Sequence, residues 1–230
     1  MCNNLTSIQV DDTNPNYDSR SNCNGIVRKS DSALIATCRT TQISNDISIL
    51  GDYCFDGTIM HSVKIPESVL HVSSNAFSGC NEIDEIIVSP DNPNYISPKG
   101  SNALLTKDGK TLLLGCRTTV IPNGVEKIEH NAFMGRYSKL MLRIPNTIKE
   151  IGAFAFSHCN VLHEVIVPQS VQSIGPYAFE GCTNLVAVQI PSSVKKIDIY
   201  TFSNCYNLSI VSLSEGLEEI ARHAFLNCKN

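Results

Sequence analysis

The sequence contains no tryptophan, and charged residues make up only 17% of its 230 positions. Charged residues are about 25% of an ordinary soluble domain, so this surface depends on other polar groups, namely 21 Asn and 25 Ser. The formal net charge is -4, which argues against a nucleic-acid binder, because such a protein presents a basic face to phosphates. No apolar run approaches the ~18 residues of a membrane helix, so no membrane insertion is expected in this segment.

Motifs of catalysis and of cofactor binding are also missing. The sequence has no Cys-x-x-Cys, no His-Glu-x-x-His, no glycine-rich phosphate loop and no recognisable Ser-His-Asp or Cys-His motif. A thiolate–imidazole pair among His158, Cys159 and His163 is conceivable, but His158 aligns with residues of surface turns, and we favour a solvent-exposed histidine. The sequence therefore predicts no catalytic residue, no metal and no cofactor, and a protein that is not an enzyme.

An internal repeat is the main signal. Phenylalanines recur every 23 residues, at Phe133, Phe156, Phe179, Phe202 and Phe225. Cysteine, proline and isoleucine series keep the same step, as in Cys159, Cys182, Cys205 and Cys228. A unit of this length cannot bury its apolar side alone, whereas stacked copies bury a continuous core. The period therefore predicts a solenoid.

One copy shows how a turn of this solenoid is built. In Leu162-x-x-Val165-x-Val167-Pro168, Val165 and Val167 alternate with Ile166, as in a strand with one buried face, and proline ends the strand. Val171-x-x-Ile174 predicts a second short extended piece, and Ala178-Phe179 a short helical turn. We expect one parallel sheet and an internal spine of phenylalanines. The expected turns number about nine, marked by Val10, Ile43, Ile65, Val88, Ile121, Ile144, Val167, Ile190 and Leu213.

The first part of the chain repeats at a longer step of 78 residues, since Asn14-Pro15-Asn16-Tyr17 recurs as Asn92-Pro93-Asn94-Tyr95. Each long unit carries extra chain. In the second copy, Asp108-Gly109 separates two apolar runs, which is a strong signal for a β-hairpin over residues 102–116. The segment from Gly25 to Cys38 predicts the same hairpin. We expect residues 102–116 to protrude from the stack as a two-stranded ribbon.

The ten cysteines follow the repeat rather than a disulfide pattern. Most occupy one repeat position, where a small buried apolar residue suffices. Equivalent Cβ atoms in a stack stay about 5 Å apart, while a disulfide needs roughly 3.5–4.5 Å, so free thiols are predicted. Cys54 stands where other copies have alanine, and only Cys23 lacks a packing explanation.

The unit Leu-x-x-Val-x-Ile-Pro-x-x-Val-x-x-Ile-x-x-x-Ala-Phe-x-x-Cys resembles the BspA-like (Treponema pallidum type) leucine-rich repeat over essentially the whole chain. The resemblance implies an α/β leucine-rich-repeat right-handed solenoid, mainly β, and a cell-surface or secreted location. It also implies adhesion to a protein ligand, such as a host extracellular-matrix or bacterial surface protein, and it brings no catalytic residues. No capping repeat is visible, so we expect residues 1–230 to be a single solenoid within a longer protein.

A curved solenoid presents its strands as a broad face, and the outward strand positions are the candidate binding surface. The candidate residues are Lys64, Glu85, Ile87, Met141, Arg143, Glu164, Ile166, Gln189 and Ile210. Exposed isoleucines often mark contacts, although β propensity explains them equally well. The predicted function is a non-catalytic protein-binding or adhesion module. The alternatives are a passive structural spacer and, less favoured, the regulatory part of an enzyme whose catalytic domain is missing.

Overall fold

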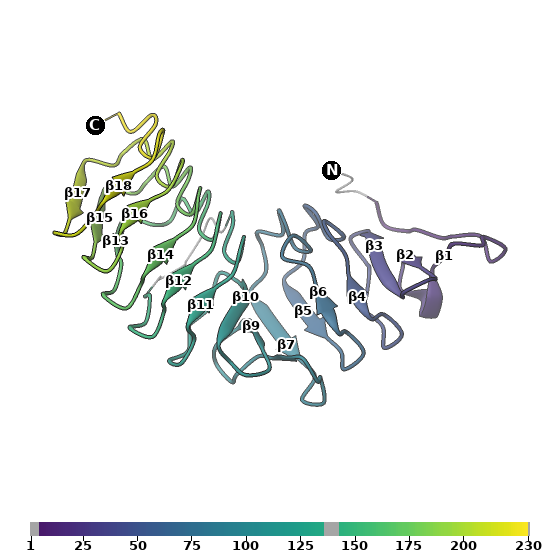
Figure 1. Cartoon of the computed structure of the whole chain (residues 1–230). Coiled ribbons are helices and arrows are strands. Elements are labelled where there is room, and N and C mark those ends of the chain that lie inside the picture. Colours follow the sequence, from purple (N-terminus) through teal and green to yellow (C-terminus); the bar gives the residue numbers. More distant parts are fainter. Residues whose placement is uncertain (1–4, 136–142, 230) are drawn as a thin grey trace.

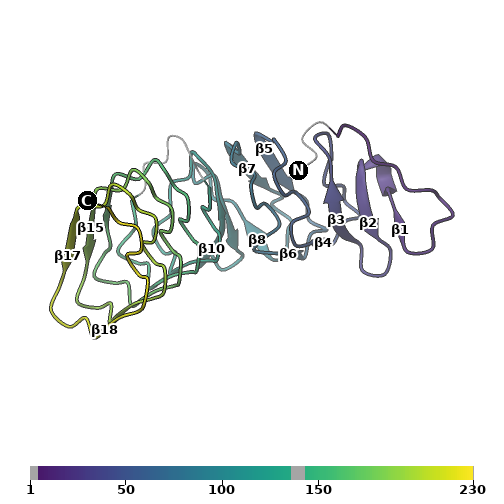
Figure 2. The ribbon, with the colours of Figure 1, turned by 90° about the horizontal axis from the view of Figure 1, so that it is seen from above.

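A computed structural model describes residues 5–135 and 143–229. They form an elongated stack of solenoid turns built from β-strands, and the turns follow one another in sequence order (Figure 1). The same stack seen from above is shown in Figure 2. The predicted solenoid is confirmed. Within the described ranges the only helix is one 3-10 turn at Arg20–Asn22, and the Ala-Phe segments form hydrogen-bonded turns instead of helices.

Each regular turn contributes strands to two sides of the stack. One side carries seven short strands whose pairings are all parallel. These are β4 (Ile49–Leu50), β6 (His71–Val72), β11 (Lys127–Ile128), β12 (Glu150–Ile151), β14 (Ser173–Ile174), β16 (Lys196–Ile197) and β18 (Glu219–Ile220). The other side, called the strand face from here on, carries β5 (Ser62–Ile65), β7 (Glu85–Val88), β13 (Glu164–Ile166), β15 (Ala187–Ile190) and β17 (Ile210–Leu213).

Among the described residues the strand face comprises two separate sheets, where the sequence predicted one continuous sheet. β5 pairs with β7, and β13, β15 and β17 form a separate parallel sheet. The backbone around Ile43 and Ile121 is not a strand. In the turn that precedes each of these residues, the N–H groups of Cys38 and Cys116 donate to threonine hydroxyls three residues later.

Both inserted hairpins exist, but the prediction that residues 102–116 protrude is wrong. β8 (Tyr95–Ile96), β9 (Ala103–Thr106) and β10 (Thr111–Gly115) form an antiparallel ribbon, and β10 continues in parallel to β11. The first unit repeats this arrangement with β1 (Tyr17–Asp18), β2 (Gly25–Arg28) and β3 (Ala33–Thr37), and β3 pairs with β4. In the second hairpin, the tip at Asp108 is exposed, as predicted.

The second hairpin is a partition between two hydrophobic cores. Leu105 and Leu112 belong to the core on its C-terminal side, while Leu104 and Leu114 belong to the core on its N-terminal side. Because its apolar residues are consecutive instead of alternating, the hairpin buries side chains on both faces. A protruding ribbon would have left one of these faces in water.

The phenylalanine spine is accordingly interrupted at the hairpin. Phe55 stacks on Phe77 with 5.1 Å between ring centroids, and a second stack runs from Phe133 to Phe225. Phe156 and Phe179 are fully buried with their centroids 5.2 Å apart, which confirms the prediction made for this pair.

The Asn-Pro-Asn-Tyr motif joins the two long units through its side chains. Asn92 is fully buried, and its Nδ2 donates to the carbonyl oxygens of Pro66 at 2.6 Å and Val69 at 3.0 Å. Its Oδ1 accepts from the N–H groups of Asn94 at 2.9 Å and Tyr95 at 2.8 Å. The asparagine thus satisfies backbone groups that a regular strand would otherwise pair.

The repeated cysteines have a role beyond filling space. The thiols of Cys182 and Cys205 donate to the carbonyl oxygens of Phe156 at 3.1 Å and Phe179 at 3.2 Å, one turn earlier. Both are free, as is Cys23, which is buried and therefore has a packing explanation that the sequence did not reveal. Burial raises the pKa of the Cys205 thiol to about 12, so this thiol remains protonated and able to donate.

Gly115 lies where the hairpin meets the second phenylalanine stack, and a Cβ atom there would be 2.0 Å from Cε1 of Phe133. The Phe133 ring has no room to retreat, because Phe156 stacks on it at 5.1 Å. We expect Gly115→Ala to lower the free energy of unfolding by about 1–3 kcal/mol, measured by chemical denaturation. Thr37 occupies the equivalent place in the first hairpin, so Thr37→Ala is the control and should have a smaller effect. Equal losses of stability in the two variants would contradict the proposed clash between a Cβ atom at residue 115 and the Phe133 ring.

Candidate binding surface

The N-terminal part of the strand face brings Lys64, Glu85 and Ile87 together. β5 and β7 pair in register, with Lys64 beside Ile87 and Ser62 beside Glu85. All of these side chains are exposed, and Ile87 is 40% exposed. The intervening Val63 and Ile86 are buried, because alternate residues of a strand point to opposite faces.

The C-terminal part brings Glu164, Ile166, Gln189 and Ile210 together on β13, β15 and β17. Ile166 lies in one row with Gln189, and Glu164 lies in the next row with Ala187 and Ile210. Ile166 is 59% exposed and Ile210 is 56% exposed. The two isoleucines are thus on the same face but in different rows, so a ligand would have to cover both rows to contact both.

The two remaining candidates differ in what the structure says of them. Arg143 is exposed and lines a hollow together with Glu164 and Ile166, so it borders the C-terminal group. Met141 lies outside the described residues. Among the described residues, the predicted face therefore consists of two groups, one on β5 and β7 and one on β13, β15 and β17.

A second aromatic stack, which the sequence analysis missed, runs along the turns. Phe154, Tyr177, Tyr200 and His223 stack with centroids 4.6 to 5.1 Å apart, and each has a positive φ of 55° to 61°. Their 23-residue spacing was available in the sequence as a signal. Because each ring covers a face of its neighbour, we interpret the stack as stabilising the strained turns.

The histidine and cysteine residues considered as a thiolate–imidazole pair do not meet. The Cys159 thiol donates to the Phe133 carbonyl oxygen at 3.0 Å, whereas Nε2 of the half-exposed His158 lies 3.1 Å from a Glu180 carboxylate oxygen. Among residues 5–135 and 143–229, no cluster of three potential metal ligands occurs. Over the same ranges, no helix has the length and apolar character required to span a membrane.

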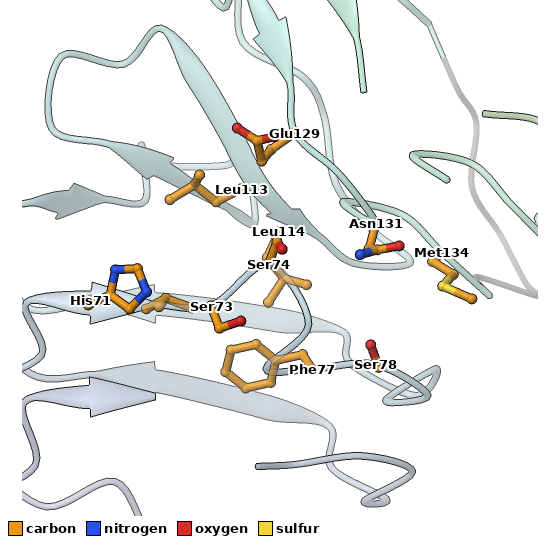
Figure 3. A pocket seen from close by; sticks show the side chains of 11 residues that line it. His71, Ser73, Ser74, Phe77, Ser78, Leu113, Leu114, Glu129, Asn131 and Met134 are labelled. Carbon is orange, nitrogen blue, oxygen red and sulfur yellow. The ribbon is translucent and has the colours of Figure 1, made fainter. Parts of the chain in front are cut away.

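A groove between β6 and β10 was also missed, because it depends on where the second hairpin lies. We call it the junction groove, with a volume of about 330 Å³. Figure 3 shows its two walls, one from β6 and the turn after it, the other from β10 and the segment after β11. The first wall carries His71, Val72, Ser73, Ser74, Phe77 and Ser78, and the second carries Leu113, Leu114, Glu129, Asn131 and Met134.

Comparison with known families and structures gives three results. Residues 34–100 and 115–230 match the BspA type leucine-rich repeat region, in six copies. A search of curated proteins finds no match. Several solved structures resemble the fold.

Three of the similar structures show the extent of the likeness. A leucine-rich cell surface protein from Faecalibacterium prausnitzii A2-165 is 26% identical, with a TM-score of 0.59 over 78% of this chain. A leucine-rich repeat protein from Eubacterium ventriosum is 20% identical (TM-score 0.63, 80% of this chain), and the pneumococcal vaccine antigen PcpA is 17% identical (TM-score 0.57, 80% of this chain). The matched region covers 54%, 63% and 50% of those chains, respectively.

Proposed function

The chain belongs to the BspA-type leucine-rich repeat family, and we propose that it is a non-catalytic protein-binding module of a bacterial surface or secreted protein. The similarity to a leucine-rich cell surface protein supports the location. The ligand that we propose is a protein of the host extracellular matrix or of a bacterial surface, bound for adhesion.

The observation that carries the proposal is the exposed apolar groups on the strand face. Ile166 and Ile210 expose more than half of their surface on β13 and β17, the two outer strands of one sheet, with β15 between them. Glu164 and Gln189 beside them add hydrogen-bonding groups, which gives the mixture of apolar centre and polar surroundings found in protein interfaces. Few aromatic residues lie on this face, so we expect modest affinity.

The test is a double variant, Ile166→Asp with Ile210→Asp, on purified extracellular-matrix and bacterial surface proteins immobilised for surface plasmon resonance. Binding should weaken about tenfold or more, because a carboxylate would be desolvated against the ligand. The fold should be unaffected, because both side chains point outward. Leu70→Asp is the matched control, since Leu70 is an apolar residue outside the strand face that is 51% exposed.

Three outcomes would count against this surface. Normal binding by the double variant would place the ligand elsewhere on the molecule. Equal loss of binding in Leu70→Asp would indicate a nonspecific effect of added charge. If the native chain bound none of the immobilised proteins, a passive spacer would become the better interpretation.

A further inference from the structure

Asparagine is followed by glycine twice in the sequence, at Asn24-Gly25 and at Asn123-Gly124. This dipeptide is chemically labile, because glycine has no side chain to keep its backbone nitrogen away from the carbonyl carbon of the asparagine side chain. Attack of that nitrogen closes a cyclic imide. Ring closure requires a backbone that can rotate and an asparagine side chain that is free to move, so the fold decides which of the two copies can react.

Asn123-Gly124 meets both requirements. The dipeptide forms the exposed tip of a turn that is closed by a hydrogen bond from the Val125 N–H to the Pro122 carbonyl oxygen. At 3.4 Å, this bond is longer than the roughly 2.7–3.2 Å of ordinary N–H···O bonds. A Cβ atom at Gly124, which has a φ of +101°, would meet nothing within 4 Å. The Asn123 side chain makes no hydrogen bond to any residue in the described ranges.

Asn24-Gly25 is the same dipeptide held rigidly in place. Oδ1 of Asn24 accepts a hydrogen bond from the Ile8 N–H at 2.7 Å, and Nδ2 donates to the Thr6 carbonyl oxygen at 2.9 Å. Gly25 is buried in β2, where it pairs with Thr37 of β3. Imide formation here would break both side-chain hydrogen bonds and disturb the strand pairing, so the fold protects this copy.

The next repeat supplies a second comparison, because Asn146-Thr147 occupies the equivalent turn. Asn146 is as exposed as Asn123, but the residue that follows it is β-branched and crowds the backbone nitrogen. Thr147 is also held by its hydroxyl, which donates to the Val125 carbonyl oxygen at 2.7 Å and accepts from the Gly124 N–H at 3.3 Å. Exposure of an asparagine in this turn is therefore not sufficient, and the following glycine distinguishes Asn123.

We propose that Asn123 is a site of spontaneous deamidation in the folded protein, with water as the co-reactant. Hydroxide removes the proton of the Gly124 N–H, and the nitrogen bonds to Cγ of Asn123 while the bond from Cγ to Nδ2 breaks. The amide group leaves as ammonia and takes its remaining proton from water. A water molecule then opens the imide at either carbonyl, which leaves aspartate or isoaspartate at position 123. The inference does not depend on the proposed function.

The modification adds one negative charge to a hollow of about 490 Å³ that Asn123 and Arg143 both line. A carboxylate is compatible with this place in the repeat, since Glu215 occupies the equivalent position before Gly216, whose φ is +102°. Isoaspartate differs, because it lengthens the main chain by one atom just before the fully buried Val125. We therefore expect the aspartate product to leave stability unchanged and the isoaspartate product to lower it.

The test is incubation of the 230-residue chain in heavy-oxygen water at mildly alkaline pH, followed by digestion at acidic pH and peptide mapping by mass spectrometry. Opening of the imide introduces one labelled oxygen at the reacting residue. Label should enter at Asn123 about tenfold faster or more than at Asn24 and Asn146. In guanidinium chloride, Asn24 and Asn123 should react at similar rates, because only the fold distinguishes them, and Asn146 should remain slow.

Gly124→Ser tests the role of the glycine within a folded chain. Ser170 and Ser193 occupy the equivalent position in later turns, so the variant should fold, and labelling at Asn123 should slow about tenfold or more. Four results would each overturn the proposal. They are equal labelling of Asn24 and Asn123 in the native chain, equal labelling of Asn146 and Asn123, unchanged labelling in Gly124→Ser, and an unlabelled native Asn123 after the unfolded chain has reacted completely.

Discussion

Phe179→Ala is expected to lower the free energy of unfolding by about 3–5 kcal/mol. Phe179 is fully buried, and its ring stacks on both Phe156 and Phe202. Shortening it removes both contacts and leaves a cavity that neighbouring turns can close only by moving relative to each other. The loss is measurable by chemical denaturation followed by circular dichroism, with hydrogen exchange reporting whether turns on either side open together.

Phe225→Ala is the matched control for this prediction. Phe225 occupies the same repeat position, but it is only partly buried and has one described ring neighbour, Phe202. Phe225→Ala should therefore lower the free energy of unfolding by clearly less than Phe179→Ala does. Equal costs at the two positions would show that stacking within the core is not what stabilises the solenoid.

Asn92→Ala is expected to lower the free energy of unfolding by a similar amount, about 3–5 kcal/mol, for a different reason. It leaves the carbonyl oxygens of Pro66 and Val69, and the N–H groups of Asn94 and Tyr95, without the partners that Asn92 provides. Each buried polar group left unpaired costs about 1–3 kcal/mol, less where water enters. Thermal and chemical denaturation of the single variant would measure the loss.

The first copy of the motif supplies the control. Asn14 accepts the same two turn hydrogen bonds from Asn16 and Tyr17, each at 3.0 Å, but it is only half-buried. Asn14→Ala should cost about 1 kcal/mol. Aspartate sharpens the comparison: Asn14→Asp should be nearly neutral, while Asn92→Asp should destabilise, because a carboxylate would replace the amide that donates to two carbonyl oxygens. A neutral Asn92→Asp would contradict the bridging role of Asn92.

Several features of the molecule could be predicted because they repeat. Phe156 and Phe179 are buried and stacked because a fixed period brings equivalent residues of successive turns next to each other. The outward positions of Ile166 and Ile210 follow from the two-residue period of a strand. The thiol hydrogen bonds of Cys182 and Cys205 could not be foreseen, because they depend on the distance to a carbonyl group one turn earlier.

The sequence by itself determined the solenoid, the position of its core residues and the existence of two hairpins, because each depends on local pattern and on a period that every turn shares. Only the tertiary structure decided what happens where the period fails. Leu104 and Leu105 face different cores, so the second hairpin enters the stack, divides the phenylalanine spine and forms part of one wall of the junction groove. The physical reason is that a non-repeating insertion has no equivalent neighbour to fix its direction, and its place is set by which apolar faces it can bury on both sides.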